Sequence, residues 1–494
     1  MGSIQLQAIL SNIDTRQNLS TLRQELKNSI KRESLIQEII PHANAFIQLL
    51  EHEDAKTRKN SALLMGDLSF PVFCNALYRG YINETQRFVK SAYLTALQSY
   101  DCSSFVTELK KQITQLSTTP LTPENTKHIQ EEIRALSKLI VQEEGFTPHT
   151  FTGFNMPLDC ILLTNKLCKE LIEAEITSGK IVPFRAGVRV ITEDLHEILN
   201  LRTYSELLFV VPGLSVADKN PVIAAKTIAQ SSLLTLLRNI HAEKTPFYFR
   251  IELKSKQPLD IRSKYVKKLS SELELYTNRN LQNSTSNYEI ELRLIENKTG
   301  DYNVLLKLFT LVDNRFSYRK ESVSASIRPV NAAQLVALAK DYMVENSRTL
   351  DPFCGVGTML LERQMLVKGN TSYGIDFYAP AIEKAQINTD AAGQIVHYIN
   401  RNFLDFKHEY LFDEIFTNMP YSTGHKSIDE IELLYKDFFP KAREVLTNSG
   451  TIIMYSRNPE LVRELAYHYK YNILEAFEFM PKENAWLFII RFIH

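Results

Sequence analysis

The last third of the chain alternates between strand-like and helix-like segments, and this order constrains the fold more than any other feature. Four apolar or β-branched runs are separated by helix-like stretches, and they end in "TLDPFC", "TSYGIDF", "DEIFTNMP" and "GTIIMYS". Successive strand–helix units imply a parallel, doubly wound sheet. Two final strands, 472–480 and 485–493, add an antiparallel member. Residues 326–494 are therefore predicted to form a Rossmann-like α/β domain with a mostly parallel, seven-stranded sheet.

The first strand of this domain runs into the turn "DPFCGVGT" (351–358), between a strand and a helix. Gly355 and Gly357 let the backbone turn sharply near a ligand, and the helix that follows offers free N–H groups. The turn lacks the third glycine of a dinucleotide motif and the Lys-Ser/Thr pair of a P-loop, which disfavours diphosphate ligands. Asp351 would repel phosphate but suits a cationic amino acid, as S-adenosylmethionine carries. A plain structural turn is the alternative.

Two further acids follow later strands. Asp376 ends the second strand in "YGIDF" and can accept both hydroxyls of a ribose. Asp405, in "RNFLDF", follows the third strand and can accept from an adenine amino group. For both acids, a capping or loop role is the alternative. Cys354 has no base near it in the sequence, so we interpret it as a small residue packed in the turn and not as a nucleophile.

The string "TNMPYS" (417–422) follows the fourth strand and predicts chemistry on an amine. An exocyclic amine of a base is a poor nucleophile, because its lone pair is delocalised into the ring. Two groups that accept hydrogen bonds from the N–H groups of the amine turn this lone pair out of the plane of the ring. The Asn418 side chain and the Met419 carbonyl can be these acceptors, since Pro420 restricts Met419 to extended geometry. Tyr421 offers a flat face for stacking a base. A simple Asn-Met-Pro turn is the alternative.

This order of motifs resembles class I S-adenosylmethionine-dependent methyltransferases, and Asn-x-Pro-Tyr resembles motif IV of amino-methyltransferases, usually Asn/Asp-Pro-Pro-Tyr/Phe. Met419 departs from that pattern at its second position. This departure bears on the tightness of the turn and not on the chemistry. The predicted residues acting on the amine are Asn418, Met419, Pro420 and Tyr421. The predicted cofactor-binding residues are Asp351, Pro352, Cys354, Gly355, Gly357, Thr358, Asp376, Asp405 and Arg328.

Residues 150–325 mix strands and helices and contain a basic stretch. Strand patterns occur in "KIVPFRAGVRVIT" (180–192), "FYFRIELK" (247–254) and "YEIELRLIENKTGDYNVLLKL" (288–308). The segment 254–280 carries seven basic against three acidic residues, a net charge of +4. Its lysines, Lys264, Lys267 and Lys268 among them, are predicted to contact RNA phosphates. A solvated helix face is the alternative.

The region 155–310 resembles the front half of THUMP-domain RNA methyltransferases, through "LRTYSELL" (201–208), the "FYFRIELK" strand, the basic helix and the closing hairpin. The segment "SIRPVNAAQLVALAK" (326–340) resembles the helix before the cofactor motif of these enzymes, which places Arg328 and Pro329 near the cofactor. The resemblance implies a ferredoxin-like and THUMP region, and guanine N2 in tRNA or rRNA as the target.

Residues 1–145 are predicted to be helical. "KNSALLMG" (59–66) matches "VKSAYLTA" (89–96) at an offset of 30 residues, which suggests a short HEAT-type α-solenoid. A plain helical bundle is the alternative. Solenoids present binding surfaces, so we expect a protein partner for this region rather than catalysis.

Composition limits the remaining classes. The 494 residues carry no formal net charge, and five scattered cysteines fit neither a disulfide framework nor a metal site, so a cytoplasmic location is expected. No signal peptide and no membrane-spanning run is seen. The sequence thus predicts an RNA methyltransferase that uses S-adenosylmethionine and no metal. A methyltransferase acting on DNA adenine or protein glutamine, or a non-catalytic RNA-binding scaffold, is the alternative.

Overall fold

The chain divides into two compact units in the computed structural model, which describes residues 3–120, 122, 124–244, 246–422 and 427–493. The first unit comprises 1–150 and 216–304, and the second comprises 151–215 and 305–494. Each unit therefore combines two stretches that are distant in sequence. Strand β9 (Tyr302–Leu308) begins in the first unit and ends in the second. The predicted boundaries near 145 and 325 remain predictions.

The N-terminal part of the first unit is helical, as predicted. Its helices are α1 (Ile4–Leu10), α2 (Thr15–Glu25), α3 (Ser29–Ile39), α4 (Ala43–Gln48), α5 (Ala55–Leu68), α6 (Phe73–Asn83), α7 (Arg87–Leu97), α8 (Val106–Thr118) and α9 (Thr126–Glu144). The two similar strings fall on α5 and α7, which pack closely. A Cβ on Gly66 of α5 would lie 2.7 Å from the Ala96 Cα of α7. The HEAT-type array remains a prediction.

The rest of the first unit is an α/β layer. It contains β5 (Val216–Ala217), α12 (Pro221–Gln230), α13 (Leu233–Ile240), β6 (Phe247–Lys254), α14 (Leu259–Tyr276), β7 (Leu281–Asn283) and β8 (Ile290–Glu296). Strand β6 pairs in parallel with both β7 and β8. Helix α14 buries Tyr265, Leu269 and Leu273 and exposes Lys264, Lys267 and Lys268.

The second unit opens with four antiparallel strands in the order β2-β3-β1-β4. Its elements are β1 (Leu158–Leu163), α10 (Lys169–Glu175), β2 (Lys180–Val182), β3 (Gly187–Thr192), α11 (Leu195–Asn200) and β4 (Glu206–Phe209). Strand β4 meets the end of β9 through Phe209 and Leu306. The ferredoxin-like and THUMP assignments remain predictions.

The C-terminal part of the second unit is an α/β fold, which confirms the predicted class. Its sheet has the order β12-β11-β10-β13-β14-β16-β15, and only β16 runs antiparallel to its two neighbours. The strands are β10 (Arg348–Asp351), β11 (Thr371–Asp376), β12 (His397–Asn400), β13 (Phe412–Asn418), β14 (Leu446–Ser456), β15 (Tyr471–Met480) and β16 (Ala485–Phe492). The helices are α15 (Pro329–Ala339), α16 (Thr358–Leu366), α17 (Ala379–Ala392), α18 (Ile428–Val445) and α19 (Pro459–His468).

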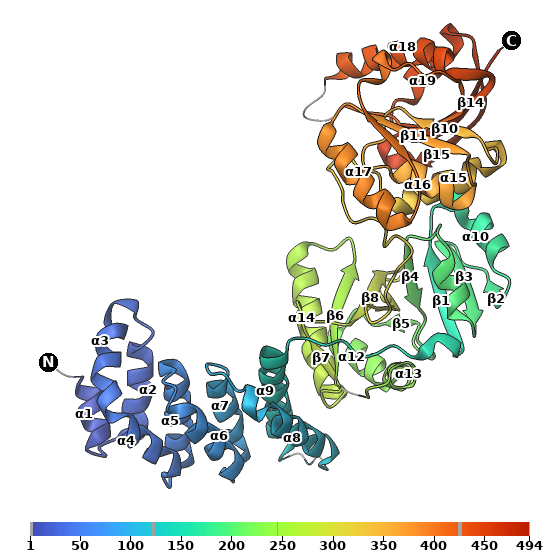
Figure 1. Cartoon of the computed structure of the whole chain (residues 1–494). Helices are drawn as coiled ribbons and strands as arrows, with labels where there is room; N and C mark the ends of the chain where they lie inside the picture. The colour runs from blue at the N-terminus through green and yellow to red at the C-terminus, as the bar shows by residue number, and fades with distance from the viewer. Residues whose placement is uncertain (1–2, 121, 123, 245, 423–426, 494) are drawn as a thin grey trace. The chain divides into compact units, whose positions relative to one another are not determined.

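Helices cover both faces of this sheet, with α18 and α19 on one side and α15, α16 and α17 on the other (Figure 1). Side chains of a strand alternate between faces, and β14 follows this rule. Ile452 and Met454 join the core beneath α18 and α19, whereas Ile453 and Tyr455 join the core beneath α15 and α16. This two-sided burial explains why the strands read as continuous apolar runs.

A buried ion pair fastens α16 to β13. The Arg363 guanidinium donates to both carboxylate oxygens of Glu414, at 3.0 Å each, and both side chains are almost fully buried. Arg363 also donates to the Val344 and Val367 carbonyls and to Ser347 Oγ, so each of its three side-chain nitrogens has an acceptor. Among the helices that we describe, none is long and apolar enough to cross a membrane.

We predict that Arg363→Met destabilises the C-terminal sheet by about 3–5 kcal/mol, because it leaves the Glu414 carboxylate buried without a partner. Urea unfolding followed by fluorescence of Trp486, the only tryptophan and a residue of β16, measures this change. Arg348→Met is the control, because its pair with Asp413 is about one-third exposed and should cost about 1 kcal/mol or less. Equal losses in the two variants would contradict the prediction.

Candidate active site

The carboxyl ends of three adjacent parallel strands bring the predicted polar residues to one edge of the sheet. Asp351 is the last residue of β10, Asp376 the last of β11 and Asn418 the last of β13. The order β11-β10-β13 makes these three strands neighbours. In an open α/β sheet, this edge is where ligands bind.

The glycine turn after β10 requires its glycines. Gly355 has φ +53° and Gly357 has φ +82°, a region that other residues rarely adopt. A Cβ on Gly357 would collide with the Tyr398 hydroxyl, whereas a Cβ on Gly355 would meet nothing within 4 Å. The Cys354 amide donates to the Ile375 carbonyl at 2.9 Å, which anchors the turn to β11. The turn therefore leaves open space at Gly355 and is closely packed behind Gly357.

Asp351 is fully buried at the start of this turn. Its Oδ1 accepts from Thr417 Oγ1 at 2.7 Å and from the Phe353 amide at 3.1 Å. Its Oδ2 has no partner within the described chain. Burial is the main cause that raises the pKa of Asp351 to about 7. A buried carboxylate oxygen without a partner suits a cationic or hydrogen-bonding ligand.

Asp376 connects β11 to the glycine turn. Its Oδ2 accepts from the Gly355 amide and its Oδ1 from the Tyr378 amide, both at 2.9 Å. Each carboxylate oxygen has two lone pairs, so both oxygens can still accept from hydroxyl groups. The Asp376 side chain is therefore compatible with both the predicted ribose contact and the alternative capping role. Asp405 is exposed at the end of a short 3-10 helix, Phe403–Asp405.

The segment after β13 is held by the neighbouring strand β14. The Met419 amide donates to the Tyr455 carbonyl at 2.9 Å, and the Met419 side chain joins the core beneath α18. The Tyr435 hydroxyl donates to the Pro420 carbonyl at 3.3 Å. Asn418 is half-buried. The backbone of this segment is fixed, and Met419 points into the core.

One face of Tyr421 is already occupied. The Arg457 guanidinium lies 4.0 Å from the centre of its ring, and Arg457 pairs with Glu483 at 2.5 Å. The predicted stacking surface is therefore limited to the other face of the ring. Arg457 was not among the predicted site residues, although it follows β14 and thus reaches the edge of the sheet that carries Asn418. Residues 423–426 lie outside the described chain.

The other predicted cofactor residues lie near the turn or at the neighbouring helix. Pro352 and Cys354 are buried, and burial raises the pKa of the Cys354 thiol well above its usual range, which agrees with a packing role. Thr358 begins α16, and its hydroxyl accepts from Arg319, which was not among the predicted site residues. Arg328 precedes α15 and is exposed.

The predicted RNA-binding lysines on α14 are partly neutralised by acids of the same helix. Lys264 lies 3.9 Å from Asp260, and Lys268 lies 2.6 Å from Glu272. Both pairs have the i,i+4 spacing, which is typical of a solvated helix face. Lys267 borders a hollow that Arg262 also lines. The charge on this face of α14 is thus smaller than the count of lysines suggests.

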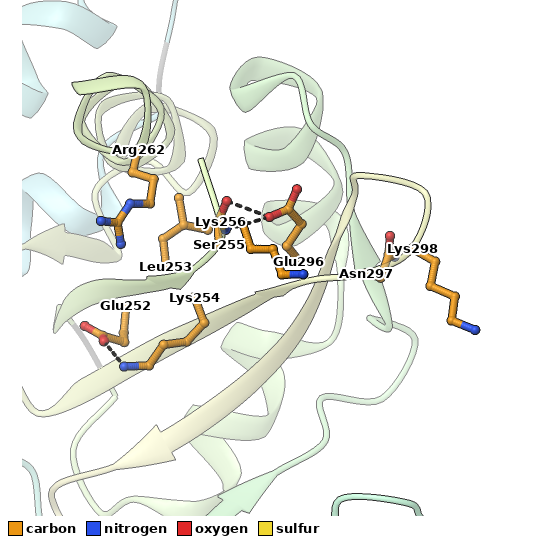
Figure 2. A pocket seen from close by; sticks show the side chains of 9 residues that line it. All are labelled: Glu252, Leu253, Lys254, Ser255, Lys256, Arg262, Glu296, Asn297 and Lys298. Atoms are coloured by element: carbon orange, nitrogen blue, oxygen red, sulfur yellow. Dashed lines mark hydrogen bonds and ion pairs between the residues drawn. The ribbon is translucent and has the colours of Figure 1, made fainter. Parts of the chain in front are cut away.

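A basic pocket of about 690 Å³ lies beside α14 in the first unit (Figure 2). It is lined by Glu252, Leu253, Lys254, Ser255, Lys256, Arg262, Glu296, Asn297 and Lys298. Glu252 pairs with Lys254, and Glu296 accepts from Ser255 Oγ and the Lys256 amide. Lys256, Arg262 and Lys298 form no ion pair with a described residue, and the buried Nε of Arg262 has no hydrogen-bond partner there. The hydrogen bond from Ser255 and, to a lesser extent, the charge of Lys256 lower the pKa of the nearby Glu296 carboxyl, and four basic against two acidic residues leave this pocket with an excess of positive charge.

No three or more His, Cys, Asp or Glu residues of the described chain are grouped to hold a metal ion. Residues 317–478 match a family model described as "RMKL-like, methyltransferase domain", which confirms the prediction of a methyltransferase domain in this part. The match contains the glycine turn, Asp376 and the Asn418 segment. No curated protein matches the chain.

Several solved structures share the fold. TrmN from Thermus thermophilus is 17% identical, with a TM-score of 0.51, over 68% of this chain and all of that chain. A predicted N6-adenine-specific DNA methylase from Listeria monocytogenes is 15% identical, with a TM-score of 0.50, over 67% of this chain and 95% of that chain. SMU.472, a putative methyltransferase complexed with SAH, is 13% identical, with a TM-score of 0.51, over 68% and 98% of the two chains.

We predict that Asp351 makes the stability of the second unit depend on pH. Its folded pKa of about 7 exceeds the ordinary value of 3.8, so between these values the folded state holds a proton that the unfolded state has lost. Stability therefore falls as pH rises, by about 1.4 kcal/mol per unit until pH 7. Between pH 5 and pH 8, the parent should lose about 3 kcal/mol relative to Asp351→Asn, which cannot titrate.

Urea unfolding followed by Trp486 fluorescence at both pH values checks this difference. Asp437→Asn, on the exposed face of α18, is the matched control and should keep the profile of the parent. If Asp351→Asn and the parent change equally with pH, the raised pKa is wrong.

Proposed function

We propose that this chain transfers a methyl group from S-adenosylmethionine to an exocyclic amine of an RNA base, namely N2 of guanine in tRNA or rRNA. The observation that carries the proposal is the Asn-Met-Pro-Tyr segment at the end of β13, directly beside the strand that ends in Asp351 and the glycine turn. This arrangement would place hydrogen-bond acceptors for an amine next to a site for a cationic methyl donor.

The residues around the glycine turn fit S-adenosylmethionine. The unpaired Oδ2 of buried Asp351 can accept from a cationic amino acid group, and the open space at Gly355 allows a ligand to approach the backbone. Asp376, which borders the turn, can accept from the ribose hydroxyls. When bound, the cofactor supplies a methyl group on a sulfonium sulfur, which the amine attacks in line.

Asn418 and the Met419 carbonyl would then orient the amine. Each of these two acceptors takes a hydrogen bond from one N–H group of the amine. The nitrogen lone pair then turns out of the ring plane toward the methyl group. The Met419 amide donates to the Tyr455 carbonyl, which fixes the peptide between Asn418 and Met419 and so limits movement of the residue that carries the second acceptor. Catalysis of this kind depends mainly on positioning. The target base must leave its stack and lie against the free face of Tyr421.

RNA as the substrate is supported by the basic pocket of the first unit and by the resemblance of 155–310 to THUMP-domain enzymes. Lys256, Arg262 and Lys298 can neutralise phosphates, which supply most of the affinity of proteins for nucleic acids. The similarity in fold to a predicted N6-adenine-specific DNA methylase makes DNA adenine the alternative. The same acceptors would serve that amine, so the nucleic acid must be tested directly.

We expect Asn418→Ala to slow single-turnover methylation of bulk tRNA and rRNA about a hundredfold, which corresponds to about 3 kcal/mol of lost transition-state stabilisation. Binding of S-adenosylmethionine, measured by calorimetry, should stay within about twofold of the parent, because Asp351 and Asp376 are unchanged. Asn472→Ala, an exposed position on β15, is the matched control and should keep the parent rate. An Asn418→Ala protein with the parent rate would refute the amine-orienting role.

We expect the pocket variant Lys256→Gln, Arg262→Gln and Lys298→Gln to bind RNA more weakly. The slope of log affinity against log salt should fall by about 0.7–0.9 for each phosphate that the variant no longer neutralises. Lys264→Gln with Lys268→Gln is the control, because both lysines are paired with acids of α14. A larger decrease in affinity for this control than for the pocket variant would place RNA on the exposed face of α14 instead.

A further inference from the structure

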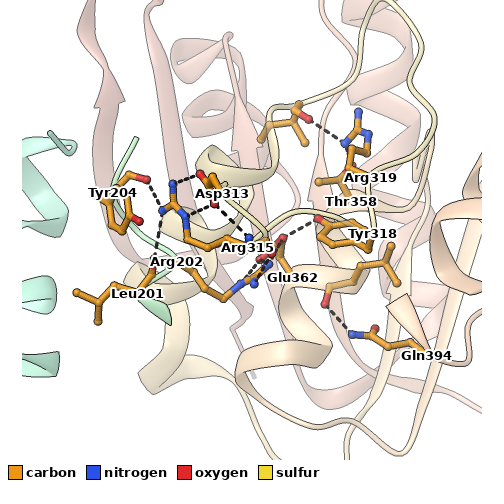
Figure 3. A network of polar contacts seen from close by, with 12 residues as sticks. Leu201, Arg202, Tyr204, Asp313, Arg315, Tyr318, Arg319, Thr358, Glu362 and Gln394 are labelled. Carbon is orange, nitrogen blue, oxygen red and sulfur yellow. Dashed lines mark hydrogen bonds and ion pairs between the residues drawn. The ribbon is translucent and has the colours of Figure 1, made fainter. Parts of the chain in front are cut away.

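Arg319 lies beside the glycine turn and contacts only neutral acceptors. Its Nε donates to the Glu321 carbonyl at 2.8 Å, and its Nη1 donates to the Ile327 carbonyl at 3.3 Å and to the Thr358 hydroxyl. Arg319 and Thr358 lie together in Figure 3. Since Thr358 is the first residue of α16, the guanidinium stands at the start of that helix.

Arg319 has no direct ion pair of its own, which distinguishes it from its neighbours (Figure 3). Arg202 pairs with Glu362 at 2.8 Å, and Arg315 pairs with Asp313 at 2.7 Å. Arg319 is half-buried and forms no ion pair with a described residue. Burial lowers the pKa of its guanidinium, and the nearby Glu362 carboxylate, which pairs with Arg202, offsets part of this effect. Because buried cations are normally paired directly, the guanidinium can take an anionic partner of its own.

The start of α16 adds to this positive potential. The helix has nine residues, its N-cap is Gly357 in the left-handed conformation, and its first turn contains no acid. The first N–H groups of a helix have no partner within the helix, and its dipole favours an anion there. Two independent sources of positive potential therefore meet at Thr358.

The opposite polarity occurs at the other end of the same turn. Asp351, which is seven positions before Thr358 in the sequence, has a buried carboxylate oxygen with no partner in the described chain. The turn thus offers an acceptor for a cation at its beginning and donors for an anion at its end. A zwitterionic amino acid group carries both charges, and the methionine part of S-adenosylmethionine is such a group.

We propose that Arg319 binds the carboxylate of the methionine part of S-adenosylmethionine. This assignment rests on the proposed function, because it takes S-adenosylmethionine as the ligand of the turn. The planar fork of arginine suits a carboxylate, and its contact with Thr358 Oγ1 holds the fork at the helix start. Arg319 would then select cofactors that keep the carboxylate.

The test compares calorimetric binding of S-adenosylmethionine with that of decarboxylated S-adenosylmethionine, which lacks only this group. The parent should bind S-adenosylmethionine at least about tenfold more tightly. Arg319→Gln should lose most of this preference, by weakening the binding of S-adenosylmethionine about tenfold to a hundredfold and that of the decarboxylated compound little. Lys320→Gln, at the exposed neighbouring position, is the control and should keep the preference.

If Arg319 has only a structural role, Arg319→Gln should weaken the binding of both compounds by the same factor. Such an equal loss, or an unchanged preference, overturns the assignment. A parent that binds neither compound overturns the proposed function and this assignment with it. If Arg319→Gln does not fold, Arg319→Lys keeps the charge without the fork and should show an intermediate preference. An Arg319→Lys protein with the full preference of the parent would contradict the proposed contact.

Discussion

The buried pair between Arg363 and Glu414 is the interaction on which the site most depends. Arg363 is on the helix that begins at the glycine turn, and Glu414 is on the strand that ends in Asn418. Two charges removed from water are stable together only when their hydrogen bonds are satisfied. The guanidinium meets this condition with bonds to Glu414, Val367 and Ser347. The pair therefore fixes the proposed cofactor turn relative to the proposed amine acceptor.

Two hydrogen bonds further fix the position of the cofactor turn relative to the amine acceptor. Thr417, next to Asn418, donates to Asp351 at the start of the glycine turn, and the Met419 amide is held by Tyr455. The residues proposed to act on the methyl donor and on the amine are thus joined by a hydrogen bond through Thr417 as well as by the buried pair. Since methyl transfer requires an in-line approach, such rigid support is a physical reason for placing both functions on adjacent strands.

The sequence predicted the order of the C-terminal elements because each helix and strand has its own local pattern and the glycine turn has a specific shape. It also predicted that Asp351, Asp376 and Asn418 would follow strands, and parallel pairing then brings them to one edge. It did not predict the contact of Arg457 with Glu483 or that of Arg319 with Thr358, because these contacts join residues that are 26 and 39 positions apart. The acids at i,i+4 from Lys264 and Lys268 are visible in the sequence, but only the structure shows that Lys256, Arg262 and Lys298 line one pocket.

The central claim, that this chain methylates an amine of an RNA base, is tested most directly by identifying the product. The purified protein is incubated with isotopically labelled S-adenosylmethionine and either total RNA, DNA or a protein mixture, and each polymer is digested and analysed by mass spectrometry. The account predicts label in N2-methylguanosine from RNA. Label confined to N6-methyladenine from DNA or to methylglutamine from protein, or no label in any polymer, would contradict it.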